Sequence, residues 1–353
     1  MDAKRPMDVA TPLLDWYDRH RRELPWRARA GEAADPYRVW LSEVMLQQTT
    51  VATVRPRFVE WMRRWPTFDD LARADEAEVM AAWAGLGYYA RARNLLAAAR
   101  TIVRDHGGRL PDTEPALRAL PGFGDYTAAA VAAIAFGRRA VVVDANVERV
   151  AARLFAIDTP LPAARKPIRA AADTITPDTR AGDFAQAMMD LGSAICTPRK
   201  PRCLLCPLAA SCRALADGTP DAFPVRKPRA VRPHRHGTVF WLQRDGHVLL
   251  VRRPGKGLLG GMRALPTGPW QAVAPGLTDA PEAAEWRWLD TGISHGFTHF
   301  TLDLAVAVAE TATATNQGEW WPIDRLDEAG LPTLFARAAE AVGAAEAVGR
   351  QRQ

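Results

Sequence analysis

The sequence predicts two domains joined by a linker: an all-α domain over residues 1–224 and an α+β domain over residues 237–353. Apolar residues recur with helical spacing through the first part, and almost no period-two alternation interrupts them. Residues 225–236 are rich in arginine, proline and histidine, a composition typical of an extended, solvent-exposed linker. Short apolar runs around an Asp245-Gly246 turn then indicate a β-hairpin. A chain of 353 residues is long enough for two separate cores.

The helices of the first domain begin and end at recognisable residues. Asp35 followed by Pro36 predicts a capped start for a helix that closes with Gln47-Gln48-Thr49. A helix starting at Val147 would be capped by Asn146. Further helices are expected over residues 8–23, 51–65, 75–83 and 90–106, and in the second domain a helix over 331–348.

The segment Leu120–Thr127 predicts a hairpin between two helices. Gly122 and Gly124 are expected to take positive φ angles and to expose their amides. Asp125 or Thr127 would cap the following helix, which would end at Gly137. Backbone amides at a helix N-terminus form an anion site of phosphate size. An ordinary helix–helix turn is the alternative interpretation.

Two carboxylates are candidates for acid–base chemistry. Glu43 lies among apolar neighbours of its helix, so its side chain is either turned to solvent or partly desolvated. Desolvation would raise the pKa of Glu43 and suit it to proton transfer near neutrality. Asp144 follows an apolar, β-branched segment, so we expect it to approach the hairpin from a buried side.

Two turns carry an aromatic side chain beside a cation. Trp26 and Arg27 follow Leu24-Pro25, where the tryptophan either fills the core or contacts a ligand. In Gly85-Leu86-Gly87-Tyr88-Tyr89, the paired tyrosines precede Arg91 and Arg93. Such tyrosines either stack on unpaired bases or fill a gap between helices.

All four cysteines lie in one short loop, at Cys196, Cys203, Cys206 and Cys212, with six, two and five residues between them. Clustering of this kind favours a metal or cluster site over disulfides. Structural zinc sites more often carry two Cys-x-x-Cys pairs, whereas four thiolates in one compact loop suit an iron–sulfur cluster.

The overall charge favours a polyanionic partner. The formal net charge is +6 and the sequence pI is about 9.4, although basic metabolic enzymes exist too. No apolar run approaches the length of a membrane span, and residues 1–24 carry charges throughout. We therefore expect a protein of the cytoplasm that does not enter membranes.

Taken together, these segments resemble the MutY-type adenine DNA glycosylases of the helix-hairpin-helix, endonuclease III superfamily. The likeness runs from about Leu13 to Leu334. The segments that carry the likeness are residues 24–27, 40–49, 85–93, 120–127, 144–150 and 186–192, the four cysteines, and Phe297-Thr298-His299. It implies a helix-hairpin-helix glycosylase domain with a 4Fe-4S cluster loop, followed by a Nudix-like domain that recognises 8-oxoguanine.

The resemblance also implies a role for each matching residue. The enzyme would flip out and excise adenine mispaired with 8-oxoguanine or guanine in double-stranded DNA, as a monomer associated with a bacterial-type nucleoid. Glu43 would protonate N7 of adenine, Asp144 would stabilise the sugar cation, and Tyr126 and Asn146 would support them. Adenine would be contacted by Arg22, Trp26, Arg27 and Gln186, and the vacated stack by Gln48 and Tyr88. The residues implied to contact 8-oxoguanine are Thr49, Leu86, Phe297, Thr298 and His299. Gly122 and Gly124 would contact a DNA phosphate, and the four cysteines would hold the cluster.

The sequence departs from related patterns at several positions. Bifunctional relatives carry a lysine where this chain has Tyr126, so a Schiff base cannot form there and a monofunctional enzyme is expected. Thr298 stands where the family usually has serine, and Ala145 where it usually has glycine. The segment 260–266 lacks the glutamates that would hold magnesium for pyrophosphate hydrolysis.

Three other functions stay open. The first is a pyrimidine-damage glycosylase with lyase activity of the endonuclease III type. The second is a non-catalytic iron–sulfur DNA-binding protein. The third, a nucleotide-hydrolysing Nudix enzyme, is disfavoured by the missing glutamates.

Overall fold

A computed structural model describes residues 8–29, 31–227, 231–255, 257–313 and 317–351. Contacts divide the chain into two compact units, residues 1–74 with 94–228 and residues 75–93 with 229–353. Residues 228–230 of the expected linker lie outside the described residues. The strand β1 (His234–Arg244) begins within that expected linker, because its first residues pair with a neighbouring strand. The domain limits at residues 224 and 237 stay a prediction.

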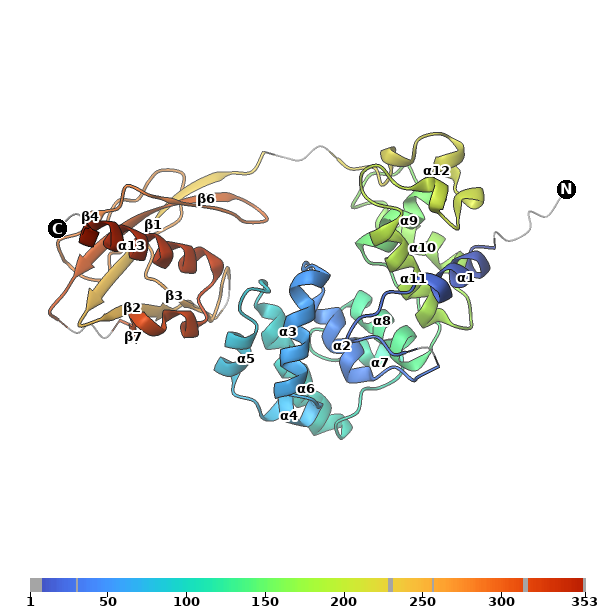
Figure 1. The fold of residues 1–353 in the computed structure, drawn as a ribbon, viewed down its shortest axis with the longest axis horizontal. Coiled ribbons are helices and arrows are strands. Elements are labelled where there is room, and N and C mark those ends of the chain that lie inside the picture. The colour runs from blue at the N-terminus through green and yellow to red at the C-terminus, as the bar shows by residue number, and fades with distance from the viewer. Residues whose placement is uncertain (1–7, 30, 228–230, 256, 314–316, 352–353) are drawn as a thin grey trace. The chain divides into compact units, whose positions relative to one another are not determined.

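Among the described residues of the first unit, the regular elements are helices, as expected (Figure 1). Its helices are α1 (Ala10–His20), α2 (Pro36–Met45), α3 (Val51–Arg64), α4 (Phe68–Arg73), α6 (Ala90–His106), α7 (Glu114–Arg118), α8 (Asp125–Phe136), α9 (Ala145–Leu154), α10 (Arg165–Ile175), α11 (Ala181–Ala194) and the short α12 (Arg213–Ala216). The helix α6 begins in the segment that belongs to the second unit and continues into the first.

The helix α8 occupies the centre of the first unit and packs against α2, α7 and α11. Every residue from Thr127 to Ala133 is buried, and most of them are alanines, whose small side chains let the neighbouring helices come close. Gly182 on α11 serves the same approach, because a Cβ there would lie 2.8 Å from the Cα of Ile134. The hairpin before α8 and the helices beside it are thereby held in fixed positions.

The hairpin forms where expected, but its details differ from the prediction. Gly122 has φ +73°, whereas Gly124 has φ −80° and is itself the N-cap of α8. Neither Asp125 nor Thr127 caps the helix. Asp125 is exposed and pairs with Arg118 at 2.9 Å, and the buried Thr127 hydroxyl accepts a hydrogen bond from Gln47 at 3.1 Å.

Two other helix ends also differ from the prediction. The helix α2 starts at the Asp35 cap as expected but ends at Met45, so residues 47–49 form a turn after the helix. The helix α9 is capped by Asp144, whose carboxylate accepts from the amides of Asn146 and Val147. Asn146, the expected cap, is the second residue of the helix.

The second unit is built on a mixed sheet of seven described strands. They are β1, β2 (His247–Arg252), β3 (Arg263–Ala264), β4 (Arg287–Trp288), β5 (Ile293–Gly296), β6 (Thr301–Glu310) and β7 (Glu319–Pro322). Their order is β3-β2-β1-β6-β4, with β5 also pairing with β6 and β7 with β2. The parallel pair β1 and β6 forms the centre, with His234 opposite Thr301 and Gln243 opposite Glu310.

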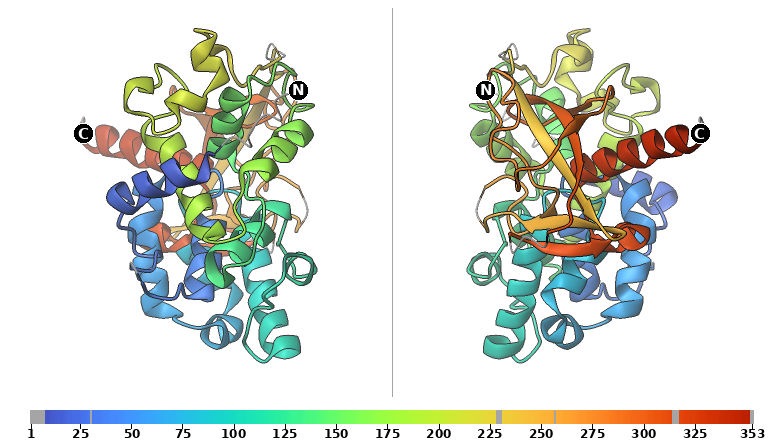
Figure 2. Two further views of the ribbon diagram at one scale, coloured as in Figure 1. Left: turned by 90° about the vertical axis from the view of Figure 1, so that its right-hand side faces the viewer. Right: turned by 90° about the vertical axis from the view of Figure 1, so that its left-hand side faces the viewer.

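The expected β1–β2 hairpin and C-terminal helix are both present. Asp245 and Gly246 both have positive φ, at 48° and 70°, which is the requirement of the two-residue turn that joins twisted strands. The first half of the helix α13 (Thr333–Gln351) packs against the sheet, and the right-hand view in Figure 2 shows the helix extending away from the strands toward the C-terminus. Leu334, Phe335 and Ala338 of this helix belong to the same core as the strand residues.

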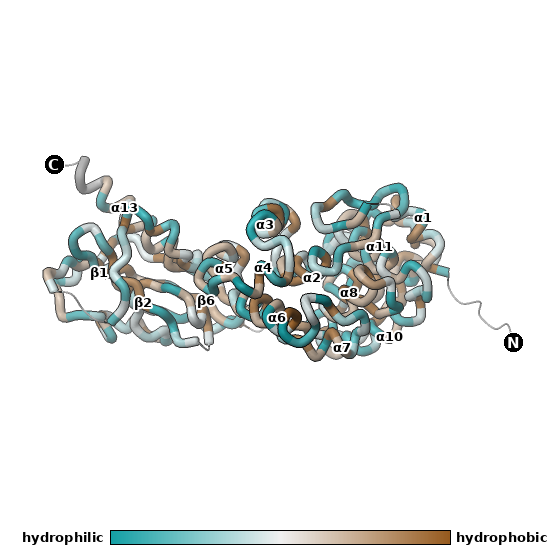
Figure 3. The backbone as a smooth tube through the Cα atoms, turned by 90° about the horizontal axis from the view of Figure 1, so that it is seen from below, coloured by the Kyte–Doolittle hydropathy of each residue, from teal (hydrophilic) through white to brown (hydrophobic). Residues whose placement is uncertain are grey.

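The hydropathy of the chain is that of amphipathic elements packed around cores. In Figure 3 the tube of α6 alternates between hydrophobic and hydrophilic stretches. None of the described helices combines the length and the apolar character needed to cross a membrane.

Candidate active site

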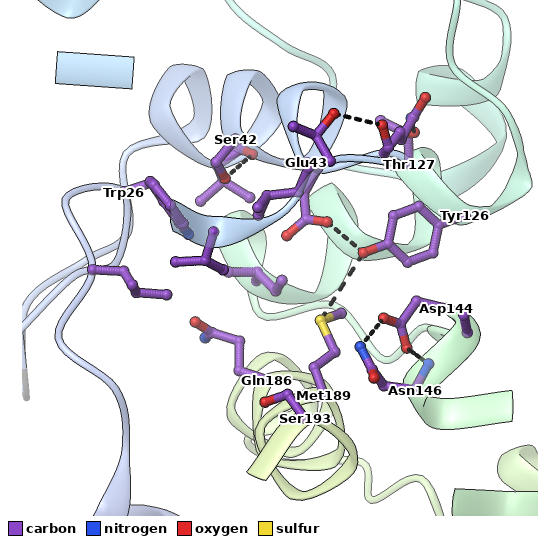
Figure 4. A pocket seen from close by; sticks show the side chains of 18 of the residues that line it. Trp26, Ser42, Glu43, Tyr126, Thr127, Asp144, Asn146, Gln186, Met189 and Ser193 are labelled. Atoms are coloured by element: carbon purple, nitrogen blue, oxygen red, sulfur yellow. Dashed lines mark hydrogen bonds between the residues drawn. The ribbon is translucent and has the colours of Figure 1, made fainter. Parts of the chain in front are cut away.

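A cavity of about 880 Å³ opens in the first unit beside the hairpin. Figure 4 shows side chains from α2, α8, α9 and α11 converging on it. It is lined by the majority of the residues expected at the site, namely Arg22, Trp26, Arg27, Glu43, Gln48, Thr49, Gly122, Gly124, Tyr126, Asp144, Asn146 and Gln186. Leu24, Ser42, Thr127, Met189 and Ser193 are among the further lining residues.

Glu43 points from α2 into this cavity and is 7% exposed. Burial raises the pKa of its carboxyl to about 7, and the neighbouring Asp144 raises it as well, while the Tyr126 hydrogen bond and Arg27 lower it. Of the two interpretations that the sequence left open, a solvent-facing and a desolvated glutamate, the structure has the second. A carboxyl with this pKa exists in both protonation states near neutrality, which is a property of general acids and bases.

Tyr126 lies between Glu43 and Asp144 (Figure 4). Its hydroxyl donates a hydrogen bond to Oε2 of Glu43 and lies 4.0 Å from the sulfur of Met189. Burial and the nearby carboxylates of Glu43 and Asp144 raise the pKa of Tyr126 well above its usual value. The phenol therefore stays protonated and acts here as a hydrogen-bond donor.

Asp144 is held by three donors at the start of α9. Oδ1 accepts from the amides of Asn146 at 2.9 Å and Val147 at 2.7 Å, and Oδ2 accepts from Nδ2 of Asn146 at 2.8 Å. The positive end of the helix dipole also favours negative charge at this position. Asn146 is itself fixed, because Arg149 donates to its Oδ1 at 2.9 Å.

Arg22 and Arg27 share one buried carboxylate, Asp190 on α11. Arg27 makes two hydrogen bonds to it, at 2.6 and 2.8 Å, and Nε of Arg22 makes one at 2.7 Å. Burial of Asp190 acts to raise its pKa, but the hydrogen bonds and charges of Arg27 and Arg22 outweigh it and the pKa is lowered. The two arginines thus enter the cavity wall as parts of an ion network.

The turn and hairpin residues expected to touch DNA lie at the rim of the cavity. Gln48 is exposed and has φ +60°, a conformation that costs energy for a residue with a side chain and is concentrated at functional positions. A Cβ on Gly122 would lie 2.7 Å from Cβ of Asn94, so this position requires glycine for space as well as for φ. Trp26 is buried, with its ring edge-on to Phe58 at 5.3 Å.

The remaining expected contacts belong to the second unit. Tyr88 is 55% exposed, has φ +47°, and its hydroxyl lies 3.5 Å from Oγ1 of Thr298. Phe297 packs against Trp270 at 5.7 Å, and His299 lies in the same turn between β5 and β6. The side chain of Leu86 is buried, with 4% of the residue exposed.

The four cysteines surround a small cavity of about 30 Å³, together with Arg153. The donor set at this cavity is four thiols from one short loop, which suits a compact metal centre.

Arg153 ties the cysteine loop to α9. Its side chain is 2% exposed, and its guanidinium donates to Sγ of Cys196 at 3.2 Å, to the Thr197 carbonyl at 2.7 Å and to the Pro220 carbonyl at 2.7 Å. Arg149, one turn earlier, donates to the carbonyls of Cys196 and Gly192. The loop and the Asp144 site are thus connected through two arginines of one helix.

The sequence patterns did not predict three residues that support the site, namely Asp190, Arg149 and Arg153. Asp190 carried a usable signal, because an acidic residue within an apolar helical run is the same signal that identified Glu43. The two arginines carried none, since arginines on a helix are usually solvated.

Known families match both parts of the chain. A profile described as HhH-GPD superfamily base excision DNA repair protein matches residues 41–175, and a NUDIX domain profile matches residues 238–341. A solved thermostable thymine-DNA glycosylase aligns with a TM-score of 0.53 and 32% identity, over 59% of this chain and 94% of that one.

Curated relatives at higher identity are adenine DNA glycosylases. The one from Mycolicibacterium smegmatis is 42% identical over 215 residues, covering 61% of this chain and 72% of the relative. The human one is 39% identical over 311 residues, covering 73% of this chain, which thereby spans 57% of the human protein. With a helical HhH-GPD region followed by a Nudix-like sheet and this degree of identity, the chain belongs to the adenine DNA glycosylase family.

Proposed function

We propose that this protein is a monofunctional DNA glycosylase that excises adenine mispaired with 8-oxoguanine or guanine in double-stranded DNA. The observation that carries the proposal is the pair Glu43 and Asp144, two carboxyl groups in different environments that line one cavity. Different environments allow one carboxyl to hold a proton while the other is an anion. Membership of the adenine DNA glycosylase family supports the choice of base.

The proposed reaction breaks the bond between the sugar and N9 of adenine. Glu43 protonates N7, which makes the purine a better leaving group. The sugar becomes oxocarbenium-like, and the Asp144 carboxylate, held by its three donors, stabilises that positive charge. Glu43, now deprotonated, activates the water that completes hydrolysis. Tyr126 keeps the Glu43 carboxyl in place throughout.

The adenine has to leave the duplex before it can reach Glu43. Extrusion costs about a few kcal/mol and is easier from a mispair. Trp26 and the paired arginines form the wall of the proposed adenine pocket, and the exposed Gln48 and Tyr88 are proposed to occupy the vacated stack. The proposed readers of 8-oxoguanine are Thr49, Leu86 and the turn Phe297–His299. The amides of Gly122 and Gly124 are proposed to hold a DNA phosphate.

Cys196, Cys203, Cys206 and Cys212 are proposed to hold a 4Fe-4S cluster. When bound, such a cluster would join distant parts of the loop and fix its shape. Arg199, Lys200 and Arg202 on that loop would then face DNA phosphates as a fixed basic surface. Iron analysis tests this part: about four iron atoms per chain are expected, and one zinc ion would contradict it.

The test of the activity is a glycosylase assay on duplexes that place adenine opposite each of the normal bases and 8-oxoguanine. Adenine release is expected opposite 8-oxoguanine and guanine, leaving an abasic site that breaks only after alkali. A borohydride-trapped covalent complex would instead favour a lyase of the endonuclease III type. Tight binding without release would favour a non-catalytic DNA-binding protein.

A further inference from the structure

Three potential metal ligands converge on one face of the second unit, outside the cavity described above. His234 and His236 lie two residues apart on β1, so their side chains point to the same side of the sheet. Asp303 on β6 is the direct neighbour of His236 in the parallel pair. One ligand atom from each of the three lies within 4.8 Å of the others, and Nε2 of His234 lies 2.9 Å from Oδ2 of Asp303.

Neighbouring side chains hold two of these ligands from behind. Nδ1 of His234 lies 2.7 Å from Oγ1 of Thr301, so the other ring nitrogen is directed at the centre of the group. Ser294 donates to Oδ1 of Asp303 at 2.6 Å, which leaves Oδ2 directed at the same centre. Hydrogen bonds of this kind orient the ligands of protein metal sites.

The backbone beneath the group is rigid. The amide of His236 donates to the Gln271 carbonyl at 2.7 Å, and the Gln271 amide donates back at 3.0 Å. Asp303 lies in β6 between β1 and β5. Arg235 points to the opposite face, where its guanidinium lies 4.4 Å from the centre of the Phe300 ring. Its positive charge is therefore directed away from the three proposed ligands. Ligands placed on paired strands need little reorganisation to bind an ion.

From this arrangement we infer that His234, His236 and Asp303 form a binding site for a divalent transition-metal ion such as Zn²⁺. Two imidazoles and a carboxylate are the donor set of open zinc sites, in which water completes the coordination. Magnesium and calcium prefer oxygen donors alone and fit this set poorly. The side chains of His234 and Asp303 are 47% and 45% exposed, which leaves room for that water. The inference does not depend on the proposed DNA chemistry.

A bound ion would link β1 to β6 below the turn Phe297–His299, which runs between β5 and β6. Since the ion would bind the folded state and not the unfolded chain, its presence should raise the temperature at which the second unit unfolds.

The experiment is a Zn²⁺ titration of the full-length protein against a chromophoric chelator. Wild type is compared with His236→Ala, with Asp303→Asn, which keeps the side-chain shape, and with the control His106→Ala, an exposed histidine at the end of α6. The cysteine loop is identical in all four proteins, so its contribution cancels in the differences. Wild type and His106→Ala should bind one equivalent of Zn²⁺ more than either site variant does. In the site variants, binding of this equivalent should be at least tenfold weaker.

Thermal unfolding of the same four proteins gives a second readout. Added Zn²⁺ should raise the temperature at which the second unit unfolds in wild type and in His106→Ala. It should leave this temperature unchanged in Asp303→Asn. Equal zinc binding and equal thermal response in all four proteins would overturn the inference and leave His234 and Asp303 as a surface ion pair. If His236→Ala does not fold, the Asp303→Asn result decides.

Discussion

The hydroxyl of Tyr126 donates a hydrogen bond to the Glu43 carboxylate inside a cavity that Asp144 also lines. This hydrogen bond lowers the pKa of Glu43, but burial dominates and the pKa is raised to about 7. Protein stability, the pH dependence of the reaction and the choice of proton donor are all connected to this one contact.

Glu43→Gln should make the protein more stable at alkaline pH. The pKa of Glu43 is about 7 in the folded state, against an ordinary 4.5, so the folded state holds the proton to higher pH than the unfolded chain. Wild-type stability should therefore fall as pH rises from about 4.5 to about 7, by on the order of 3 kcal/mol, and stay flat above. Glutamine has no proton to lose. Chemical denaturation at pH 5 and pH 8 should show this fall in wild type and a smaller one in the variant; identical pH dependence would contradict the buried-acid assignment.

Tyr126→Phe should move the pH–rate profile to higher pH. Removing the phenol removes a hydrogen bond that lowers the pKa of Glu43, so the acid stays protonated further into the alkaline range. The falling limb of the single-turnover rate should shift upward by about half to one pH unit, with a loss of at most about tenfold at the plateau. A shift to lower pH would show that Tyr126 acts in another way.

Asp190→Asn should destabilise the protein strongly. Arg27 is 8% exposed and would lose the carboxylate that compensates its buried charge. Breaking a buried pair of this kind costs about 3–5 kcal/mol. The exposed pair Arg180 and Asp18, with side chains 44% and 51% exposed, provides the control. Asp18→Asn should cost less than about 1 kcal/mol in the same urea titration. Equal losses in the two variants would mean that the Asp190 network is not structural.

Arg153→Lys should weaken the cysteine loop. Arg153 donates to a cysteine sulfur and to several carbonyls around the loop, a set that the single ammonium of lysine cannot reach. Iron content and absorbance at about 400 nm, expected for thiolate-bound iron, should fall in this variant. Arg199→Lys, an exposed change in the same loop, should leave both unchanged. Full iron retention by Arg153→Lys would count against the support that we assign to it.

The features predictable from the sequence were local ones. The Asp35-Pro36 helix start and the Asp245-Gly246 hairpin each depend on a few consecutive residues, and both are present. The helix-hairpin-helix and Nudix-like fold class was also predictable, because the resemblance to a known family uses motifs from all along the chain.

Features set by distant partners were not predictable in this way. Asp190 pairs with Arg27 and Arg22, which lie 163 and 168 residues earlier in the chain. No local sequence pattern predicts such a pairing. The cap of α9 was assigned to Asn146 instead of Asp144, because both side chains can cap and only the backbone conformation decides between them. The burial of Glu43 likewise depended on how α2 packs against α8.

The most direct test of the account is the single-turnover release of adenine from a duplex with adenine opposite 8-oxoguanine, comparing wild type with Glu43→Gln. The variant should bind the duplex as well as wild type but release adenine at least about 10³-fold more slowly, because it has no proton for N7. Release by Glu43→Gln at the wild-type rate would show that this carboxyl is not the acid, and the proposed chemistry of the cavity would be wrong.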